Sequence, residues 1–236
     1  MSEFGLQSWP SAMTMVQVLP QDQWNYNSEM SVRRNHHPDG QSQMLQQISM
    51  HFHLAKTCDP ASSNNCQLKQ QYAGWAQQLW LTQLNQALGY KAEIEHFRRI
   101  RTDCSGSVPG CNMGRMYWQT NDIWQGASWA SVDYTGRYKM VQYFVQNAYA
   151  PVLISLDGSA LHNTFSVTMI NDQPYAHQHL SGEVKLTMWC VRHKIRSSSS
   201  QAVRNFVLAR DWILNAASNG YFCVSQAMGQ RYIQLF

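Results

Sequence analysis

The sequence has few charged residues and no long apolar run. Asp, Glu, Lys and Arg make up 14% of the 236 residues, and the formal net charge is +4. The basic residues form no long cluster, which argues against sequence-independent binding of nucleic acid. No stretch reaches the roughly 18–20 consecutive apolar residues that a membrane-spanning helix needs. We therefore expect neither nucleic acid nor a membrane among the partners.

Motifs of several enzyme classes are also absent. The chain has no G-x-S-x-G nucleophile elbow, which argues against acyl transfer by serine, and no C-x-x-C pair of the kind that holds zinc. His51 and His53 would share one face of a strand, but no acidic residue or cysteine stands at matching spacing beside them, or beside His36 and His37. We predict no metal site and no cofactor.

The cysteines favour disulfides. Cys58 and Cys66 bracket one short polar loop, and Cys104 and Cys111 bracket another. Two such loops suggest an oxidising compartment. The first residues nevertheless lack the basic segment and apolar core of an export signal. We therefore expect that sequence upstream of the first residue is missing.

Apolar residues at steps of three and four predict helices over residues 41–50, 75–99 and 136–149. The polar segment 55–74 is expected to form a loop. Glu93 and Glu95 are expected on the solvent-exposed face of the second helix. The three apolar stripes are Met44, Leu45, Ile48 and Phe52; Trp80, Leu84, Ala87, Tyr90, Ile94 and Phe97; and Val141, Phe144, Val145 and Ala148.

Alternating patterns predict strands. Residues 114–125, GRMYWQTNDIWQ, alternate aromatic and polar side chains before a break at Asn121-Asp122. Beyond residue 150, NTFSVTMIND and GEVKLTMW alternate in the same way, which favours the start of an antiparallel β-sandwich. We expect one domain over 1–150, a second beginning over 151–190, and a tail over 191–236 whose pattern indicates no structure.

Four stretches resemble one family. SEFGLQSWPS, RRNHHPDGQSQMLQQISMHFHL, KMVQYF and YWQTNDIWQGASWAS are similar to segments of the β-mannosidases of glycoside hydrolase family 2, and the resemblance covers about residues 1–190. It implies an α/β fold: the C-terminal part of a TIM (β/α)8 barrel, followed by the start of a β-sandwich domain. SEFG would end the seventh barrel strand, and YWQTNDIWQ would form the eighth.

The same resemblance implies the site residues. Glu3 corresponds to the catalytic nucleophile of a retaining exo-glycosidase that removes terminal β-D-mannose from glycoprotein-derived oligosaccharides. Trp118 and Trp124 are candidates for a platform under the sugar, with Trp118 favoured, although either could pack in a core. Asn121 and Asp122 could bind sugar hydroxyls or fix the loop.

The resemblance also shows what is missing. A retaining glycosidase needs a second carboxyl group as acid/base, and the family's Asn-Glu motif for it lies far upstream of SEFG. We therefore expect a fragment of a lysosomal enzyme, whose partners are a β-mannoside oligosaccharide and the missing N-terminal part of the same enzyme. The alternative is a non-catalytic truncated product that acts as a sugar-binding or interaction module.

Overall fold

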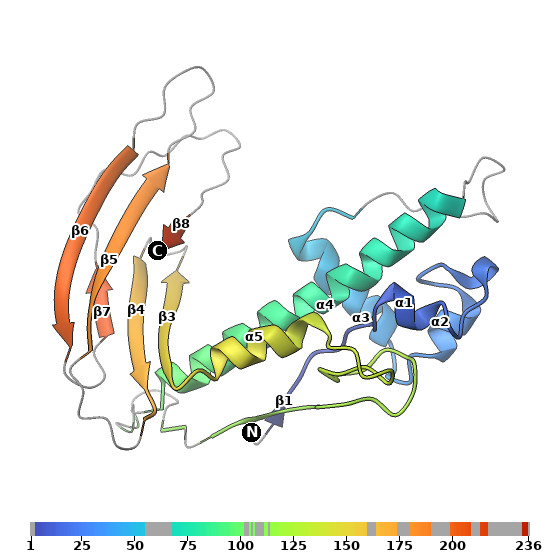
Figure 1. Cartoon of the computed structure of the whole chain (residues 1–236), viewed down its shortest axis with the longest axis horizontal. Coiled ribbons are helices and arrows are strands. Elements are labelled where there is room, and N and C mark those ends of the chain that lie inside the picture. Colours follow the sequence, from blue (N-terminus) through green and yellow to red (C-terminus); the bar gives the residue numbers. More distant parts are fainter. Residues whose placement is uncertain are drawn as a thin grey trace. The chain divides into compact units, whose positions relative to one another are not determined.

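The computed structural model describes residues 3–54, 68–101, 104, 106, 111, 112, 114–159, 164–173, 180–189, 199–208, 213–216 and 233–235. Contacts divide the chain into two compact units (Figure 1), residues 1–150 and residues 151–236. We call them the helical unit and the strand unit. Every candidate site residue belongs to the helical unit.

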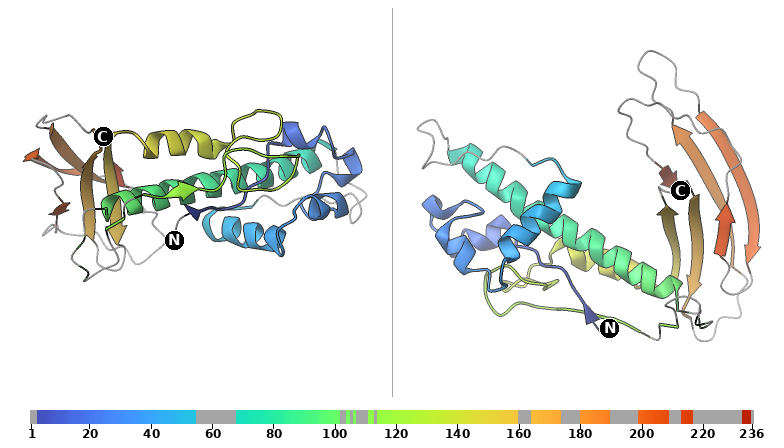
Figure 2. Two further views of the ribbon diagram at one scale, coloured as in Figure 1. Left: turned by 90° about the horizontal axis from the view of Figure 1, so that it is seen from below. Right: turned by 180° about the vertical axis from the view of Figure 1, so that it is seen from behind.

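The helical unit is built around the long helix α4, Leu68–Arg99. Helices α3 (Gly40–His51) and α5 (Met140–Ala148) pack along it, as does the short helix α1, Ala12–Met15. Figure 2 shows α5 running beside α4 in both views. A 3-10 turn, Gln21–Gln23, and helix α2, Glu29–Arg33, complete the unit's described helices.

The predicted helices are confirmed, with shifted ends. Helix α3 buries Met44 and Ile48, and α5 buries Val141, Val145 and Ala148, as their stripes require. Helix α4 begins at Leu68, so the prediction of a loop over 55–74 is wrong for its last seven residues. The loop prediction for 55–67 lies outside the described residues.

Two predictions about the faces of α4 are wrong. Trp80, placed on the apolar stripe, is 51% exposed, whereas Trp75 and Leu79 are buried. Glu95, expected in solvent, is buried, and its carboxylate lies 2.7 Å from the Lys91 ammonium, whereas Glu93 is exposed. The reason is that α4 is covered on several sides by other elements, so a single stripe does not describe its buried surface.

Two short strands lie side by side in parallel. Strand β1, Glu3–Phe4, pairs with β2, Met116–Tyr117, in the register Glu3 to Met116. Beyond Trp118, whose N–H still donates to Phe4 of β1, the predicted strand gives way to a loop, because the backbone of residues 119–122 bonds to residues 129–132 and not to a neighbouring strand. The described strands form no closed barrel.

Two apolar clusters hold the helical unit together. The first surrounds Trp9 and Tyr26, and the second joins Phe4 of β1 to Tyr90 of α4 and Val141 of α5. Trp9 is 1% exposed, and its indole N–H donates to Gln41 Oε1 at 2.9 Å. The first cluster comprises Trp9, Met15, Leu19, Tyr26, Met44, Trp75, Leu79 and Ala127.

The strand unit contains two antiparallel sheets. Strand β4 (Thr164–Asn171) lies between β3 (Val152–Ser159) and β7 (Ile213–Ala216), and it buries Val167 and Ile170. In the second sheet β5, Leu180–Trp189, lies between β6, Ser199–Leu208, and β8, Ile233–Leu235. The two predicted strands are therefore present but in different sheets, and the described residues of the tail after residue 190 form three strands.

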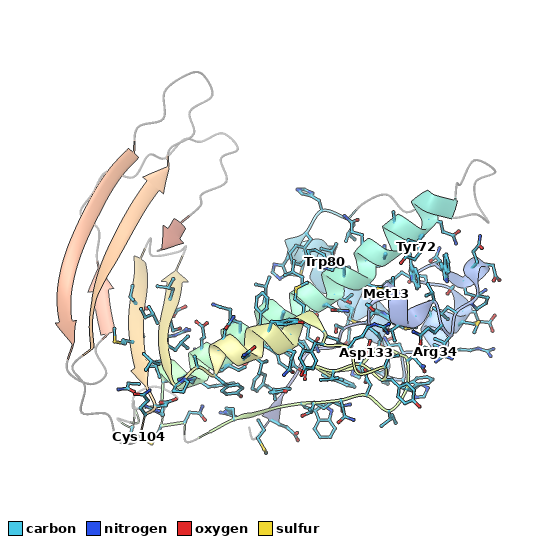
Figure 3. The ribbon with its side chains drawn as sticks, in the orientation of Figure 1. Met13, Arg34, Tyr72, Trp80, Cys104 and Asp133 are labelled. Atoms are coloured by element: carbon cyan, nitrogen blue, oxygen red, sulfur yellow. A yellow bond between two sulfur atoms is a disulfide. The ribbon has the colours of Figure 1, made fainter. Side chains whose placement is uncertain are left out.

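One of the two predicted disulfides is present. Cys104 and Cys111 are bonded to each other (Figure 3). Cys58 and Cys66 lie outside the described residues. In the described part of the chain, no helix is long and apolar enough to cross a membrane.

We predict that Trp9→Phe lowers the free energy of unfolding by about 1–3 kcal/mol, because the change removes buried apolar surface and one of the two donors to Gln41 Oε1, leaving only the Asn35 amide at 3.3 Å. Trp80→Phe is the matched control, since Trp80 is 51% exposed, and it should change stability by less than about 0.5 kcal/mol. Urea denaturation followed by circular dichroism measures both. Equal losses in the two variants would contradict this description of the core.

Candidate active site

Glu3 lies on the exposed side of the parallel strand pair. Its side chain is exposed, while the next residue, Phe4, is buried against Tyr90 and Phe97. Successive side chains of a strand point to opposite faces, so burial of Phe4 directs Glu3 away from the helices. The carboxylate is thus accessible and carried by backbone that the core fixes.

Gly5 and Tyr90 hold the two site segments together. The Tyr90 hydroxyl donates to the carbonyl of Trp118 and, at 3.1 Å, to the carbonyl of Trp129. A Cβ on Gly5 would lie 2.5 Å from the Trp118 carbonyl oxygen and 2.9 Å from Trp129 Cδ1. Burial raises the pKa of Tyr90, which keeps this donor protonated. Only glycine therefore allows the chain after Glu3 to pass so close to Trp118.

The two candidate tryptophans have different surroundings. Trp118 follows β2 directly, its backbone N–H donates to the Phe4 carbonyl at 2.8 Å, and its side chain is 51% exposed. Trp124 is half-buried, with the His36 ring 4.4 Å from its own and the Arg34 guanidinium 5.2 Å above it. Trp118 is thus one residue beyond the strand that pairs with Glu3, with an open indole, whereas Trp124 is partly covered.

Asn121 and Asp122 also differ. Asn121 is exposed, whereas the Asp122 side chain is only 2% exposed and lies 3.9 Å from the Lys139 ammonium. Burial raises the pKa of Asp122, and the charge of Lys139 opposes that effect. The Asp122 carboxylate therefore faces Lys139 inside the protein, and its role, in binding sugar hydroxyls or in fixing the loop, stays a prediction.

Lys139 joins the chain after Glu3 to the loop after Trp118. Its ammonium donates to the Ser8 carbonyl at 3.1 Å and to the Ser128 hydroxyl at 3.3 Å. Those two serines also pair backbone to backbone. Burial lowers the pKa of Lys139 to about 8, although Asp122 and Asp133 oppose the change. The lysine is thus a buried cation held by carbonyls of both segments.

Asp133 completes this network (Figure 3). Burial alone would raise its pKa, but hydrogen bonds from Thr14, Thr135 and Arg137 lower it. The Thr14 hydroxyl donates to its carboxylate at 2.6 Å, and the Arg137 backbone N–H donates at 3.0 Å. Helix α1 and the loop before α5 are therefore fixed to each other beside the site.

Sequence reasoning missed the glutamines of α4. Gln86 is fully buried; its amide donates to the Leu6 and Trp129 carbonyls at 2.8 and 3.0 Å. Gln83 donates to the Trp9 carbonyl at 3.0 Å. A usable signal was present, because both glutamines lie within a turn or two of Leu79 and Tyr90 on the buried side of the helix. Among the described residues, no group of three or more His, Cys, Asp or Glu could hold a metal ion.

We predict that Gly5→Ala destabilises the helical unit by about 1–3 kcal/mol, because the new methyl group would overlap the backbone at Trp118. Gly158→Ala is the control, since a Cβ there meets nothing within 4 Å, and it should change stability by less than about 0.5 kcal/mol. Thermal unfolding followed by circular dichroism measures both. Wild-type stability in Gly5→Ala would show that the contact is not close in solution.

We predict that Lys139 makes stability rise with pH between about 8, its folded pKa, and 10.5, its ordinary value. In that window the unfolded chain binds a proton that the folded chain has released, so raising the pH favours the folded state. The contribution is fully present above 10.5 and is lost as the pH falls through 8. The slope is at most about 1 kcal/mol per pH unit.

The measurement is the free energy of unfolding of wild type minus that of Lys139→Met, at several pH values from 7 to 10. The general effect of alkali acts on both proteins and therefore cancels in this difference. A difference that stays flat, or falls, across this range would contradict the buried-cation description.

The sequence is similar to animal β-mannosidases. It is 43% identical to the β-mannosidase of Mus musculus over 152 residues, which are 64% of this chain and 16% of the mouse protein. It is 38% identical to that of Capra hircus over 177 residues, 75% of this chain and 18% of the goat protein. The chain thus spans only about a sixth of the length of these relatives. No family model matches it.

Solved structures show the same fold. The β-D-mannosidase of Dictyoglomus thermophilum superposes with a TM-score of 0.66 at 21% identity, over 100% of this chain and 25% of that chain. The exo-chitosanase of Amycolatopsis orientalis gives a TM-score of 0.59 at 16% identity, over 99% of this chain and 25% of that chain. The chain is therefore a relative of the β-mannosidases, corresponding to one segment of these longer proteins.

Proposed function

We propose that this chain carries the nucleophile of a retaining exo-β-mannosidase, and that Glu3 is that nucleophile. The similarity to animal β-mannosidases carries the proposal. The position of Glu3, exposed on a strand whose neighbouring residue is buried, supports it. In this reaction the ionised Glu3 carboxylate attacks the anomeric carbon while the glycosidic bond breaks and the leaving oxygen takes a proton from the acid/base carboxyl. Water then hydrolyses the resulting glycosyl-enzyme.

The surroundings of Glu3 suit a sugar. Trp118 follows the partner strand with half of its surface open, and an indole face packs well on the C–H groups of a pyranose. The exposed Asn121 is placed to bind hydroxyl groups, and Trp124 is available as a further aromatic contact. Because Gly5 has no side chain, the backbone after Glu3 can pass close to the Trp118 carbonyl, which leaves this side of the strand free.

The acid/base group belongs, in this proposal, to sequence outside the 236 residues. A retaining mechanism places two carboxyl groups about 5–5.5 Å apart. The carboxylates nearest the site in the chain, Asp122 and Asp133, are buried and held by Lys139 and Thr14. A barrel completed by further strands would bring the second carboxyl to the same end of the strands. The enzyme would act in lysosomal breakdown of glycoprotein glycans, as the resemblance to animal members suggests.

We predict that a 2-deoxy-2-fluoro-β-mannosyl fluoride labels Glu3 in the native protein, because the fluorine at C2 slows both steps while the fluoride leaving group keeps formation of the glycosyl-enzyme fast, so that this intermediate accumulates. Mass spectrometry of the tryptic peptide that ends at Arg33 would locate the label. Glu3→Gln should abolish the label and reduce turnover of an aryl β-mannoside by roughly 10³-fold or more.

Glu29→Gln is the matched control. Glu29 belongs to the same peptide but is an exposed carboxylate paired with Arg33 on α2, so its removal should leave labelling intact. Label on a residue other than Glu3 would refute the assignment. If the wild-type protein shows no labelling and no turnover, the non-catalytic alternative, a sugar-binding or interaction module, is favoured.

A further inference from the structure

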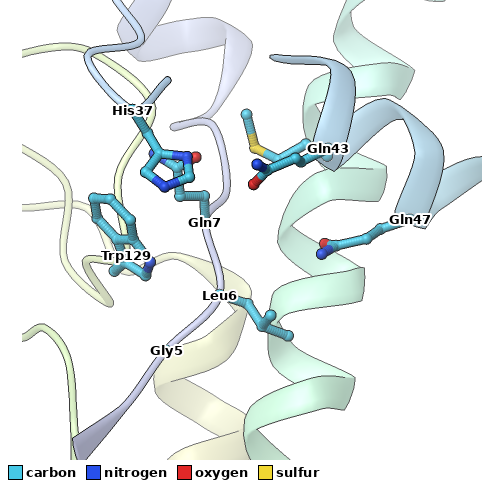
Figure 4. A pocket seen from close by; sticks show the side chains of 8 residues that line it. Gly5, Leu6, Gln7, His37, Gln43, Gln47 and Trp129 are labelled. Carbon is cyan, nitrogen blue, oxygen red and sulfur yellow. The ribbon is translucent and has the colours of Figure 1, made fainter. Parts of the chain in front are cut away.

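A hollow lies beside the chain that follows Glu3 (Figure 4). One wall is the His37 and Trp129 rings, and the opposite wall is the glutamines that α3 presents. The backbone at Gly5 passes along its base. The hollow is lined by two apolar side chains and by Gly5, Gln7, His37, Gln43, Gln47 and Trp129.

The size and chemistry of the hollow suit a single neutral ring. It encloses about 190 Å³, which is smaller than the roughly 300–1,000 Å³ of pockets for drug-sized ligands. None of its eight lining residues is Asp, Glu, Lys or Arg. Three carboxamides, an imidazole and an indole offer hydrogen bonds to hydroxyl groups and an apolar face to C–H groups. A pyranose ring carries both hydroxyl groups and an apolar C–H face, so its binding site needs both kinds of contact.

The lining retains unused hydrogen-bonding groups. His37 Nδ1 is buried and has no hydrogen-bond partner within the described part of the chain. The Gln43 side chain is exposed and bonds to no other described residue. Gln47 accepts a hydrogen bond from Asn85 at 3.0 Å, which leaves its own amide protons available. An unpaired buried nitrogen is costly, so a ligand that supplies a hydroxyl would be favoured there.

The walls of the hollow are fixed to the same groups as the candidate active site. The Tyr90 hydroxyl donates to the carbonyls of both Trp118 and Trp129. The His37 ring meets the Trp129 ring edge to face at 5.3 Å, which holds the indole. Gly5 is two residues from Glu3, a separation of roughly 7 Å along an extended chain. The hollow thus begins at the backbone two residues beyond the proposed nucleophile.

We propose that this hollow binds the sugar next to the terminal β-mannose, with His37 and Gln43 bonding to its hydroxyl groups and Trp129 packing against its ring. This inference rests on the proposed function, because it assumes that the mannose lies at Glu3. It assigns selectivity for the second ring to residues that take no part in bond cleavage. A substrate whose leaving group lacks such a ring gains nothing from the hollow.

The test measures binding in the Glu3→Gln background by isothermal titration calorimetry. The ligands are a β-1,4-linked mannose disaccharide and the one-ring methyl β-mannoside. We expect the disaccharide to bind more tightly, and Gln43→Leu and His37→Phe each to weaken it about five-fold, the effect of one lost hydrogen bond. Each change should alter the affinity for methyl β-mannoside less than two-fold, so the preference for two rings falls.

Gln46→Leu is the matched control, because Gln46 is exposed on the same helix and does not line the hollow; it should change neither affinity. The inference is overturned if Gln43→Leu and His37→Phe both leave disaccharide affinity unchanged, or if the disaccharide binds no more tightly than the single ring. The proposed function fails separately, if the Glu3→Gln protein still hydrolyses the disaccharide. A loss of affinity in Gln43→Leu would then still assign the hollow to a sugar.

Discussion

A row of polar side chains on α4 holds the irregular backbone of the candidate site. Thr82 accepts a hydrogen bond from the Trp9 backbone N–H, Gln86 donates to the Leu6 and Trp129 carbonyls, and Tyr90 donates to the Trp118 and Trp129 carbonyls. Residues 5–9 and 118–131 run as loops, so their buried backbone groups have few partners within a sheet. Helix α4 supplies those partners. Without it, neither the chain after Glu3 nor the loop after Trp118 would have one defined path.

Lys139 adds an electrostatic constraint to this arrangement. A fully buried ammonium is costly unless carbonyls and carboxylates surround it, and here both the Ser8 carbonyl and Asp122 do so. The cation joins segments separated by more than a hundred residues, and its environment lowers its pKa to about 8. The site is thus open at Glu3 and Trp118 but rigid beneath them, which suits a nucleophile that must meet a fixed atom of its substrate.

Much of the local structure follows from the sequence. Helices α3 and α5 bury the stripes that their spacing predicts, and the Cys104–Cys111 loop is bonded as its length suggested. The similarity to β-mannosidases could be read from four short stretches. The start of α4 could not, because residues 68–74 become helical through packing of Tyr72 against the first core cluster and the hydrogen bond from Gln71 to the Trp24 carbonyl.

The sequence by itself determined the apolar faces of α3 and α5, the short disulfide loop, the relationship to β-mannosidases and the choice of Glu3 as candidate nucleophile. Only the tertiary structure decided which polar residues are buried: Asp122 beside Lys139, Glu95 beside Lys91, and Gln86 beneath the site. The physical reason is that a polar residue is buried only where a distant segment supplies its hydrogen-bond or charge partner. Such pairings join residues far apart in the chain, and no local pattern records them.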